Sequence, residues 1–585
     1  MPMPQHARRN TLLPAMAVLG FATLLAWGCA PGDDGASGAA DLVLVNGRVV
    51  TMDPELPEGT ALASRGDRIV AVGSDADIEA LIGPGTRVID LEGQLAIPGL
   101  IEGHGHFVRF GMVLTQLDLT QARTWDDIVD LVEVTAREAE PGTWIEGWGW
   151  HQDRWDEPPT PSVEGLPTLA RLSEVSPDNP VFLAHTSGHG VFVNARALQE
   201  AGLTRDTADP PGGEMVRTAA GELTGMLRED SATPVREALA DYKARRPADV
   251  IESEMREHVR LAGEEALANG ITSFQDMGSP FEVIDLLKTM AEEGNLPVRL
   301  YMAIQESAED LEGRLDEYRM VGYGNGFLTV RTIGEKVLDG ALGTHGGWLL
   351  EPYTDLPRSV GFNVTPIADI VRSAQLAIEH DYQMAIQGIG DRAVRELFDL
   401  YEEAWGPEGG TERRWRIEHA QVVHPDDLPR FAQLGVIPSI QGIFACSDGP
   451  WVVDRLGEER TRERGYVFRS MIESGAVVTN GTDPPVEKID PMASFHCSVT
   501  RQLADGSIFM EEQTMTREQA LRAYTWGNAY AAFEEDIKGT LTPGKLADIT
   551  VLSQDILTVP EDEIRSTRAS YTIVGGEVRY QAGGR

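Results

Sequence analysis

The sequence predicts an α/β fold: a (β/α)8 TIM-like barrel with a split β-sandwich and an insertion that caps the barrel mouth. Three observations support this class. Residues 249–480 repeat an amphipathic helix followed by a short apolar strand. Both ends of the chain carry short hairpin-like strands. Titratable residues follow several of the apolar strands, where barrel enzymes place their chemistry.

Residues 1–29 have the pattern of an export signal. Arg8 and Arg9 precede an apolar stretch of about 16 residues, which is too short for a confident membrane span. The stretch ends at Cys29 and resembles a bacterial lipoprotein signal, although Trp27 stands where a small residue is usual. We therefore expect export to the periplasm or cell envelope and a membrane anchor through lipid on Cys29. An ordinary cleaved signal or an uncleaved anchor are the alternatives.

Residues 30–40 are rich in Gly, Ser and Asp and predict a flexible linker. The rest of the 585-residue chain has an ordinary globular composition, with 42% hydrophobic and 24% charged residues. Its 92 acidic and 50 basic residues give a net charge of −42, which argues against nucleic-acid binding. Cys446 and Cys497 remain in the mature chain, and we expect them to be buried free thiols. The sequence does not indicate an oligomeric state.

Residues 41–98 contain brief strands separated by Gly and Asp turns, which are typical of a small β-sandwich or barrel. This segment is too short to stand alone. Residues 540–585 have the same hairpin character. We therefore predict that both segments form one β-sandwich around a central domain of residues 99–539.

The central domain alternates helices and parallel strands, which predicts a doubly wound sheet or a closed barrel. No Gly-x-Gly-x-x-Gly turn follows an early strand, so the barrel is favoured. Residues 145–235 interrupt the alternation with many Gly, Pro and aromatic residues and predict a cap over the barrel mouth. Trp148, Trp150 and Trp155 of this segment either line a pocket or form the core of the cap.

The first candidate metal ligands are His104 and His106. Residues two apart on a strand point to the same face, so both imidazoles can bind one ion. Chance alone would give about 0.25 such pairs at this histidine content, so the pair carries weight only with further ligands. Further candidates stand at the ends of three later strands: His419, Asp483, and the group Glu335, Lys336 and Asp339.

These candidate ligands and several motifs occur along the chain in an order that resembles the amidohydrolase superfamily, over residues 41–582. The chain is most similar to the branch that contains the N-substituted formamide deformylases. The resemblance rests on these motifs: Asp41-Leu-Val-Leu-Val-Asn-Gly-Arg-Val, Pro98-Gly-Leu-Ile-Glu-Gly-His-Gly-His106, Ser187-Gly-His189 with Asn194, Pro211-Gly-Gly-Glu214, Asp339-Gly-Ala-Leu-Gly343, Gly390-Asp-Arg-Ala393, Arg416-Ile-Glu-His-Ala-Gln421, Gly481-Thr-Asp483 and Gly544-Lys-Leu-Ala-Asp548.

The resemblance implies a barrel with a split sandwich and one or two divalent metal ions, with zinc the favoured metal. It matches His104 and His106 to ligands on the first strand, His419 to the ligand on the sixth, and Asp483 to the carboxylate on the eighth. Asp483 is also the candidate proton shuttle, and His419 is either a ligand or a free acid–base group.

Two positions depart from the family pattern. Glu335 stands where the family usually has a carboxylated lysine, and Lys336 follows one residue later. Adjacent residues on a regular strand face opposite ways, so only one of the two can point inward unless the strand bulges. Glu335 could bridge two metals without modification, whereas Lys336 would need to be carboxylated to a carbamate. Gln387 replaces the histidine ligand of the fifth strand, and an amide is a poor ligand for zinc. The site is therefore either mononuclear or weakened.

The resulting prediction is a hydrolase that cleaves a non-peptide C–N bond of a small amide or an N-substituted formamide with metal-activated water. A deaminase or a cyclic-amide hydrolase on the same scaffold is an alternative. A catalytically weakened binding protein is another. His185, His189, His345 and Gln387 are candidate substrate contacts.

Overall fold

A computed structural model describes residues 38–186, 188, 190–210, 213–406 and 409–583. The predicted signal of residues 1–29, with Cys29, lies outside these ranges, as does His189. In the ranges described, no helix has both the length and the apolar character needed to cross a membrane.

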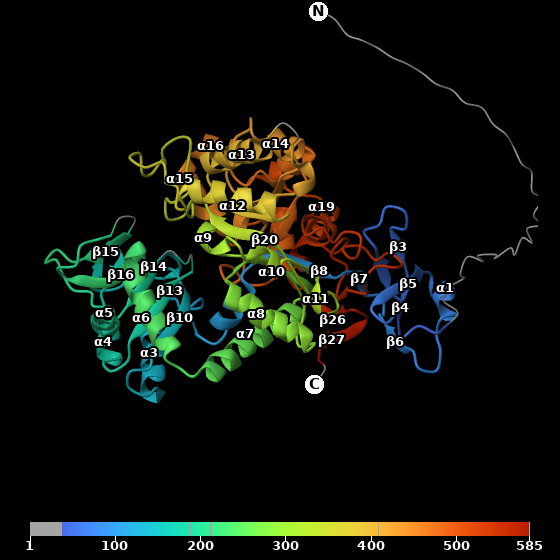
Figure 1. Cartoon of the computed structure of the whole chain (residues 1–585), viewed down its shortest axis with the longest axis horizontal. Coiled ribbons are helices and arrows are strands. Elements are labelled where there is room, and N and C mark those ends of the chain that lie inside the picture. The colour runs from blue at the N-terminus through green and yellow to red at the C-terminus, as the bar shows by residue number, and fades with distance from the viewer. Residues whose placement is uncertain (1–37, 187, 189, 211–212, 407–408, 584–585) are drawn as a thin grey trace, which may run out of the picture. The chain divides into compact units, whose positions relative to one another are not determined.

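The centre of the fold is a sheet of eight parallel strands with helices around it (Figure 1). Neighbouring strands pair in the order in which they follow one another along the chain. They are β8 (Leu100–Gly105), β17 (Ile271–Ser279), β18 (Arg299–Ile304), β20 (Leu328–Val337), β21 (Gln383–Gly388), β22 (Arg416–His419), β23 (Ile437–Gln441) and β24 (Thr479–Gly481).

The first and last strands meet and close the sheet. The amide of Asp483 donates to the carbonyl of His104 at 3.0 Å, and the amide of His106 donates to the carbonyl of Pro484 at 2.9 Å. The ends of β8 and β24 therefore lie side by side, which brings the first and last candidate ligands together. The predicted barrel class is confirmed.

The barrel helices bury one apolar face each. In α7 (Ala248–Ala268), Val259, Ala262 and Ala266 recur at helical spacing and are fully buried. Gly270, with φ of +81°, ends that turn and leads into β17. Other helices around the barrel include α2 (Phe107–Val113), α8 (Phe281–Glu292), α12 (Ile367–Glu379), α13 (Asp391–Trp405), α15 (Phe444–Leu456), α17 (Phe468–Glu473) and α18 (Pro491–Thr500).

Strands from both ends of the chain form two further sheets, which pack on a shared apolar core. One sheet has the order β5 (Arg68–Gly73), β4 (Ala61–Arg65), β1 (Leu42–Val45) and β6 (Arg87–Asp90). The other has the order β27 (Glu577–Gln581), β26 (Ala569–Val574), β25 (Ile549–Leu552), β7 (Leu95–Pro98), β2 (Arg48–Val50) and β3 (Glu58–Gly59).

Gly99 is the hinge between this β domain and the barrel, because it joins β7 directly to β8. A Cβ atom at Gly99 would lie 2.2 Å from the Thr272 hydroxyl, so only glycine fits. A buried ion pair adds a second link: Arg299 contacts the Asp548 carboxylate at 2.8 Å and 3.1 Å. Strand β8, with its two histidines, is thus held at its starting end.

The cap is a folded unit with its own six-stranded sheet. The sheet begins at residue 117, earlier than the predicted start at 145, because the chain between α2 and residue 145 also joins it. Its strands, in order, are β15 (Gly213–Arg217), β16 (Leu223–Glu229), β14 (Gly190–Val193), β13 (Val181–His185), β10 (Ile145–Trp150) and β9 (Leu117–Asp118).

The aromatic residues of the cap divide between its core and its contact with the barrel. Trp150 is 1% exposed, and its ring stacks with that of Trp155. Trp148 is also buried, but its indole Nε1 donates to the carbonyl of Pro485 at 3.2 Å. Trp148 therefore ties the cap to the loop that follows Asp483.

The prediction of free thiols is wrong, because Cys446 of α15 and Cys497 of α18 form a disulfide with Cα atoms 6.0 Å apart. The residues are 51 apart in the chain, and spacing alone does not show that two helices meet. Closing a loop of this length stabilises the fold by about 4 kcal/mol in the chain-entropy model.

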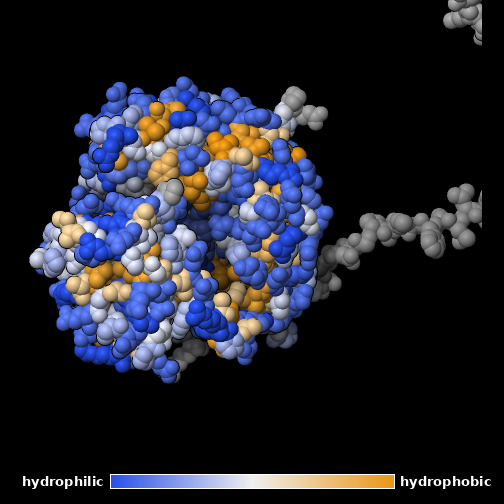
Figure 2. All heavy atoms as spheres, turned by 60° about the vertical axis from the view of Figure 1, so that its left-hand side comes forward, coloured by the Kyte–Doolittle hydropathy of each residue, from blue (hydrophilic) through white to orange (hydrophobic). Residues whose placement is uncertain are grey.

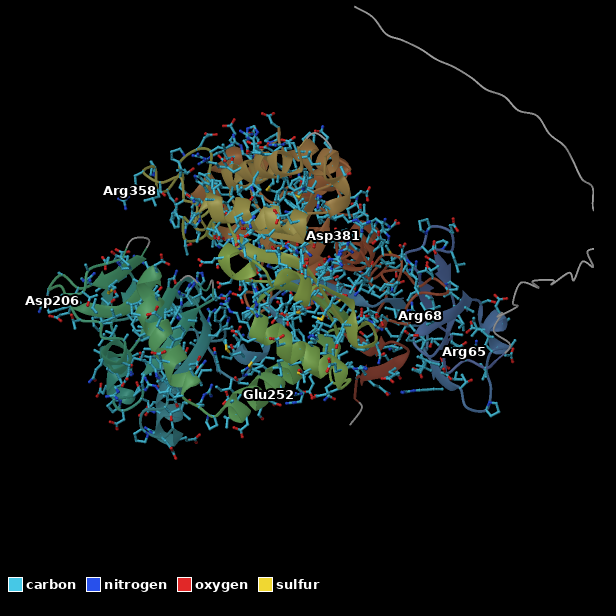
Figure 3. The ribbon with its side chains drawn as sticks, viewed as in Figure 1. Arg65, Arg68, Asp206, Glu252, Arg358 and Asp381 are labelled. Atoms are coloured by element: carbon cyan, nitrogen blue, oxygen red, sulfur yellow. A yellow bond between two sulfur atoms is a disulfide. The ribbon has the colours of Figure 1, made fainter. Side chains whose placement is uncertain are left out.

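The visible surface is mainly hydrophilic. Figure 2 shows mainly hydrophilic residues on one face, interrupted by apolar patches. In Figure 3 the labelled Asp206, Glu252 and Arg358 point outward, and all three are exposed. Repulsion among so many surface acids favours solubility and carries no information about the reaction.

Candidate metal centre

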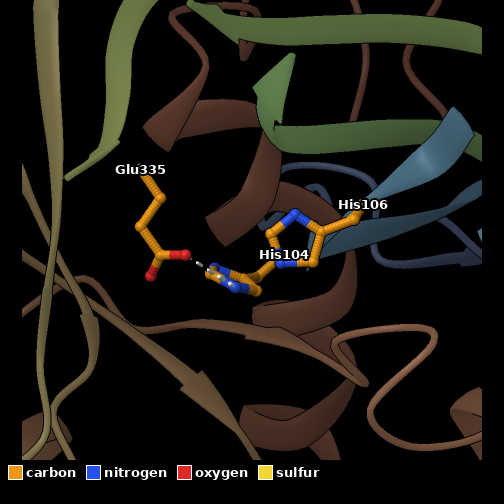
Figure 4. A group of neighbouring side chains, drawn as sticks. All are labelled: His104, His106 and Glu335. Carbon is orange, nitrogen blue, oxygen red and sulfur yellow. Dashed lines mark ion pairs between the residues drawn. The ribbon is translucent and has the colours of Figure 1, made fainter. Parts of the chain in front are cut away.

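Five predicted ligands converge at the C-terminal end of the barrel strands. Two overlapping groups have ligand atoms that all lie within 4.8 Å of one another. One group is His104, His106 and Glu335 (Figure 4), and the other is His104, His419 and Asp483. His104 belongs to both groups and is therefore the centre of the cluster.

The distances fit metal coordination. Asp483 Oδ1 lies 3.6 Å from Nε2 of His104 and 3.6 Å from Nε2 of His106. Glu335 lies 3.9 Å from His104 Nε2 and 3.4 Å from His419 Nε2. Ligand atoms about 2.1 Å from a tetrahedral ion are about 3.4 Å apart. The cluster therefore has the spacing of a coordination shell.

The buried atoms of the cluster also lack other partners. In the part of the chain described, His104 Nε2, Glu335 Oε1 and Asp483 Oδ1 are buried without a hydrogen bond. A buried polar atom with no partner costs free energy, so such groups are normally paired. A divalent cation would satisfy all three atoms, and we conclude that the residues fit a metal ion.

Glu418 orients the His104 ring by contacting Nδ1, the ring nitrogen that does not face the cluster. That nitrogen lies 2.7 Å from Glu418 Oε2, and a carboxylate can only accept, so Nδ1 carries the proton. Nε2 is then free to bind a metal, as in other carboxylate-supported histidine ligands. Burial favours a neutral Glu418, but Arg416 and His104 outweigh it and lower the pKa of Glu418 to about 2.

The carboxylates around His104 favour a positive charge on its ring. Burial lowers the pKa of His104, but the carboxylates of Glu335, Asp483 and Glu418 raise it, to about 9 in balance. The same carboxylates would stabilise a metal ion in place of that proton.

His419 is oriented in the same way by Gln441. Its Nδ1 lies 2.7 Å from the Gln441 amide oxygen, which accepts a hydrogen bond. The Phe444 ring stacks on its imidazole with centroids 6.1 Å apart. Nε2 of His419 therefore faces Glu335 with its lone pair available.

Asp483 is placed by the barrel closure and by Glu102. The Glu102 carboxylate accepts hydrogen bonds from the amide of Thr482 at 2.6 Å and from its hydroxyl at 2.9 Å. Burial raises the pKa of Asp483, while the charges of His104 and His419 lower it, and the balance is about 6. Asp483 is thus mostly ionised near neutral pH and can still take up a proton.

The backbone at two ligands is strained. His419 has φ of +69° and Asp483 has φ of +57°, a region that residues with a Cβ rarely adopt. Each costs about 1 kcal/mol or more. The positive φ of His419 breaks the alternation of side chains along the strand. The adjacent residues Glu418 and His419 can therefore both reach the candidate metal site.

An irregularity in strand β20 affects where Glu335 and Lys336 point. The pairing of β20 with β21 shifts register between Ile333 and Lys336. Glu335 faces the histidines, whereas Lys336 Nζ donates to the Glu306 carbonyl at 2.6 Å and to Asp369 at 3.1 Å. The placement supports Glu335 as the bridging group and does not bring Lys336 to the cluster.

The predicted substrate contacts lie in different parts of the fold. Gln387 Nε2 donates to the Asp339 carbonyl at 2.5 Å, which uses its amide to join two strand ends. His345 lies on a loop and contacts Asp355 at 3.0 Å. His185 is buried in the cap, where its ring contacts Trp150 and His151. The remaining candidate, His189, lies outside the described residues.

Asp339 has a structural role. Its carboxylate accepts hydrogen bonds from the backbone amides of Trp348, Ile389 and Gly390 at 2.7–2.9 Å. It therefore links the loop after β20 to the end of β21.

The prediction missed Glu418 and Gln441 as supports of the ligands. Glu418 stands beside His419 in the quoted motif, but strand alternation argued against its pointing inward.

The sequence profile of the amidohydrolase family matches residues 87–580. The chain belongs to the amidohydrolase family. Protein LONG AFTER FAR-RED 3 of Arabidopsis thaliana is 31% identical over 559 residues, which are 92% of each chain. N-substituted formamide deformylase of Arthrobacter pascens is 26% identical over 554 residues, which are 93% of this chain and 99% of that relative.

A solved structure agrees with these sequence relatives. The crystal structure of an uncharacterised metal-dependent hydrolase from Pyrococcus horikoshii OT3 matches with a TM-score of 0.72 and 26% identity, covering 89% of this chain and 99% of that one. The resemblance drawn from the motifs is confirmed. The protein is an enzyme, a metal-dependent hydrolase of the amidohydrolase superfamily.

The placement of Glu335 and Lys336 predicts opposite effects of two substitutions. Glu335→Gln removes the charge of a candidate ligand and should weaken the affinity for added zinc by more than about tenfold. Lys336→Gln should leave zinc affinity unchanged, because its Nζ bonds outside the cluster. Competition with a chromophoric chelator measures both, and Lys336→Gln is the matched control. A carbamate resonance after incubation with ¹³C-bicarbonate, lost in Lys336→Gln, would contradict this assignment.

Proposed function

We propose that this enzyme hydrolyses a non-peptide C–N bond in a small amide or N-substituted formamide and uses one or two divalent ions, with zinc favoured. The observation that carries the proposal is the similarity to N-substituted formamide deformylase over nearly the full length of both chains. The ligand set adds support, because imidazole with carboxylate is a donor set that zinc accepts.

A divalent ion, when bound, lowers the pKa of a bound water towards neutrality and polarises the substrate carbonyl. Asp483 supplies the base. Its carboxylate accepts the proton of the attacking water and returns it to the leaving amine nitrogen.

The other groups hold this arrangement in place. Glu418 and Gln441 keep the two histidine rings in the tautomers that present Nε2 to the centre. The His106 side chain is 16% exposed, whereas that of His104 is fully buried. His106 therefore borders the open side of the cluster, from which a substrate would enter.

The proposal predicts metal-dependent release of amine and formate from N-alkyl or N-aryl formamides. Chelation should abolish turnover, and zinc should restore it. Asp483→Asn should lower kcat by about 10²-fold or more, because the proton shuttle is lost. Exposed Asp206→Asn is the matched control and should retain full activity. A fully active Asp483→Asn variant would remove Asp483 from the mechanism. A zinc-loaded enzyme that cleaves no amide or formamide would overturn the proposal.

We also propose that the enzyme is exported and anchored by lipid on Cys29. The signal-like pattern of residues 1–29 supports export. The Cys446–Cys497 disulfide also favours an oxidising compartment, because disulfides are rare in the cytosol.

If the chain is exported and lipidated, the wild-type chain expressed in a bacterial host with radiolabelled palmitate should carry the label in the membrane fraction. Cys29→Ala should lose the label while keeping hydrolase activity. Cys446→Ala, which changes a cysteine far from the signal, is the control for labelling. Label that persists in Cys29→Ala, or an unlabelled wild-type chain in the cytosol, would refute the anchor.

A further inference from the structure

His106 is held differently from the other two histidines of the cluster. The rings of His104 and His419 are fixed at Nδ1 by Glu418 and Gln441. Among the residues that the structure describes, no group forms a hydrogen bond with the His106 ring. The direction in which this imidazole points is therefore set by the backbone that carries it.

The backbone at His106 is fixed on both sides. Its amide donates to the carbonyl of Pro484 at 2.9 Å, and its carbonyl accepts from the amide of Phe110 at 2.7 Å. His106 is also the N-cap residue of α2, a position whose side chain usually accepts from one of the first amides of the helix. The His106 side chain makes no such bond, because it is turned towards Asp483. The first amide of α2, that of Phe107, needs another acceptor.

Asp276 of β17 supplies that acceptor. Its Oδ2 accepts from the Phe107 amide at 2.7 Å, and its Oδ1 accepts from the Gly278 amide at 3.1 Å and from the Ser279 hydroxyl at 3.0 Å. Asp276 is 1% exposed. Strand pairing places it there, since β17 runs parallel to β8 with Asp276 opposite Gly105. A strand that carries no candidate ligand thus determines how the chain continues after one.

A carboxylate suits the three donors that surround Asp276. It offers acceptor positions on both oxygens, whereas an amide would turn its NH2 group towards one of the two N–H groups. In the described part of the chain, no basic side chain forms an ion pair with Asp276. Burying an unpaired carboxylate costs free energy, and the three hydrogen bonds compensate for that cost.

Glu306 caps a neighbouring helix in the same way. Its Oε1 accepts from the amide of Phe281, the first residue of α8, at 3.0 Å. The N-cap residue of α8 is Pro280, which has no side chain that could accept this bond. No candidate ligand precedes α8, so Glu306 is an example of capping with a structural role alone. At α2, the capped amide directly follows a candidate ligand.

We propose that Asp276 is a positioning residue for the metal centre: by capping α2 in place of His106, it fixes the backbone that directs the His106 imidazole into the cluster. Because Phe107 follows His106 directly, a shift of the first turn of α2 would also turn that ring. The proposal uses the metal centre of the proposed function, but its test requires no turnover.

Two other roles for Asp276 are possible competitors. A purely structural cap would stabilise the fold without affecting the metal. A buried negative charge would favour any nearby cation through space, whether or not His106 is a ligand. Positioning differs from both, because its effect on the metal passes through His106 and disappears when that imidazole is removed.

The test is a double-mutant cycle on the zinc affinity of the full chain, measured by competition with a chromophoric chelator. Asp276→Ala should weaken zinc binding by about tenfold or more, and His106→Ala should weaken it at least as much. In the His106→Ala background, Asp276→Ala should cause no further loss, because the ligand through which it acts is gone. Asp276→Asn can still accept from the Phe107 amide and should recover part of the affinity.

Glu306→Ala is the matched control. It removes the same kind of cap from α8 and should lower the melting temperature of the metal-free chain, as Asp276→Ala does, while leaving zinc affinity unchanged. Thermal unfolding also verifies that each variant is folded. If Asp276→Ala does not fold, Asp276→Ser replaces it in the cycle, because serine keeps a polar group but offers one oxygen to three donors.

Unchanged zinc affinity in Asp276→Ala, an equal loss in the wild-type and His106→Ala backgrounds, or an Asp276→Asn variant no better than Asp276→Ala would overturn the inference. Failure of both Asp276→Ala and Asp276→Ser to fold would also overturn it, because the residue would then serve folding alone. Zinc binding that follows the cycle in an enzyme that cleaves no amide or formamide would instead overturn the proposed function and leave the role of Asp276 standing.

Discussion

The 2.7 Å contact between His104 Nδ1 and Glu418 is the interaction on which the site depends. It sets the tautomer of His104, and His104 is the one ligand shared by both candidate metal groups. Glu418 can play this role only because Arg416 compensates its charge: Nε of Arg416 lies 2.6 Å from Glu418 Oε1, and both side chains are fully buried. Removing Arg416 would leave a buried carboxylate without a counter-charge, which is strongly destabilising.

Barrel closure is the second constraint. His104 and Asp483 are separated by most of the chain, yet hydrogen bonds at the ends of β8 and β24 place them side by side. The β domain holds the start of β8 through Gly99, and the Cys446–Cys497 disulfide joins α15 to α18. Phe444, which stacks on His419, lies on α15. Elements far from the centre therefore limit the movement of the residues in it.

The repeated helix-and-strand pattern was enough to predict the barrel, and residues after apolar strands were enough to propose His104, His106, His419 and Asp483. The choice between Glu335 and Lys336 could not be predicted, because it depends on a bulge that strand periodicity does not reveal. Glu418 was missed because the positive φ of His419 breaks the alternation of the strand. The disulfide was missed because it depends on how two helices pack.

We propose that the metal is held by His104, His106, His419, Glu335 and Asp483. Anomalous diffraction from zinc-loaded crystals, collected on both sides of the zinc edge, tests it most directly. We expect a peak about 2.1 Å from Nε2 of His104 and from a carboxylate oxygen of Asp483. Full occupancy at a peak away from His104, or bonded to a modified Lys336, would contradict it.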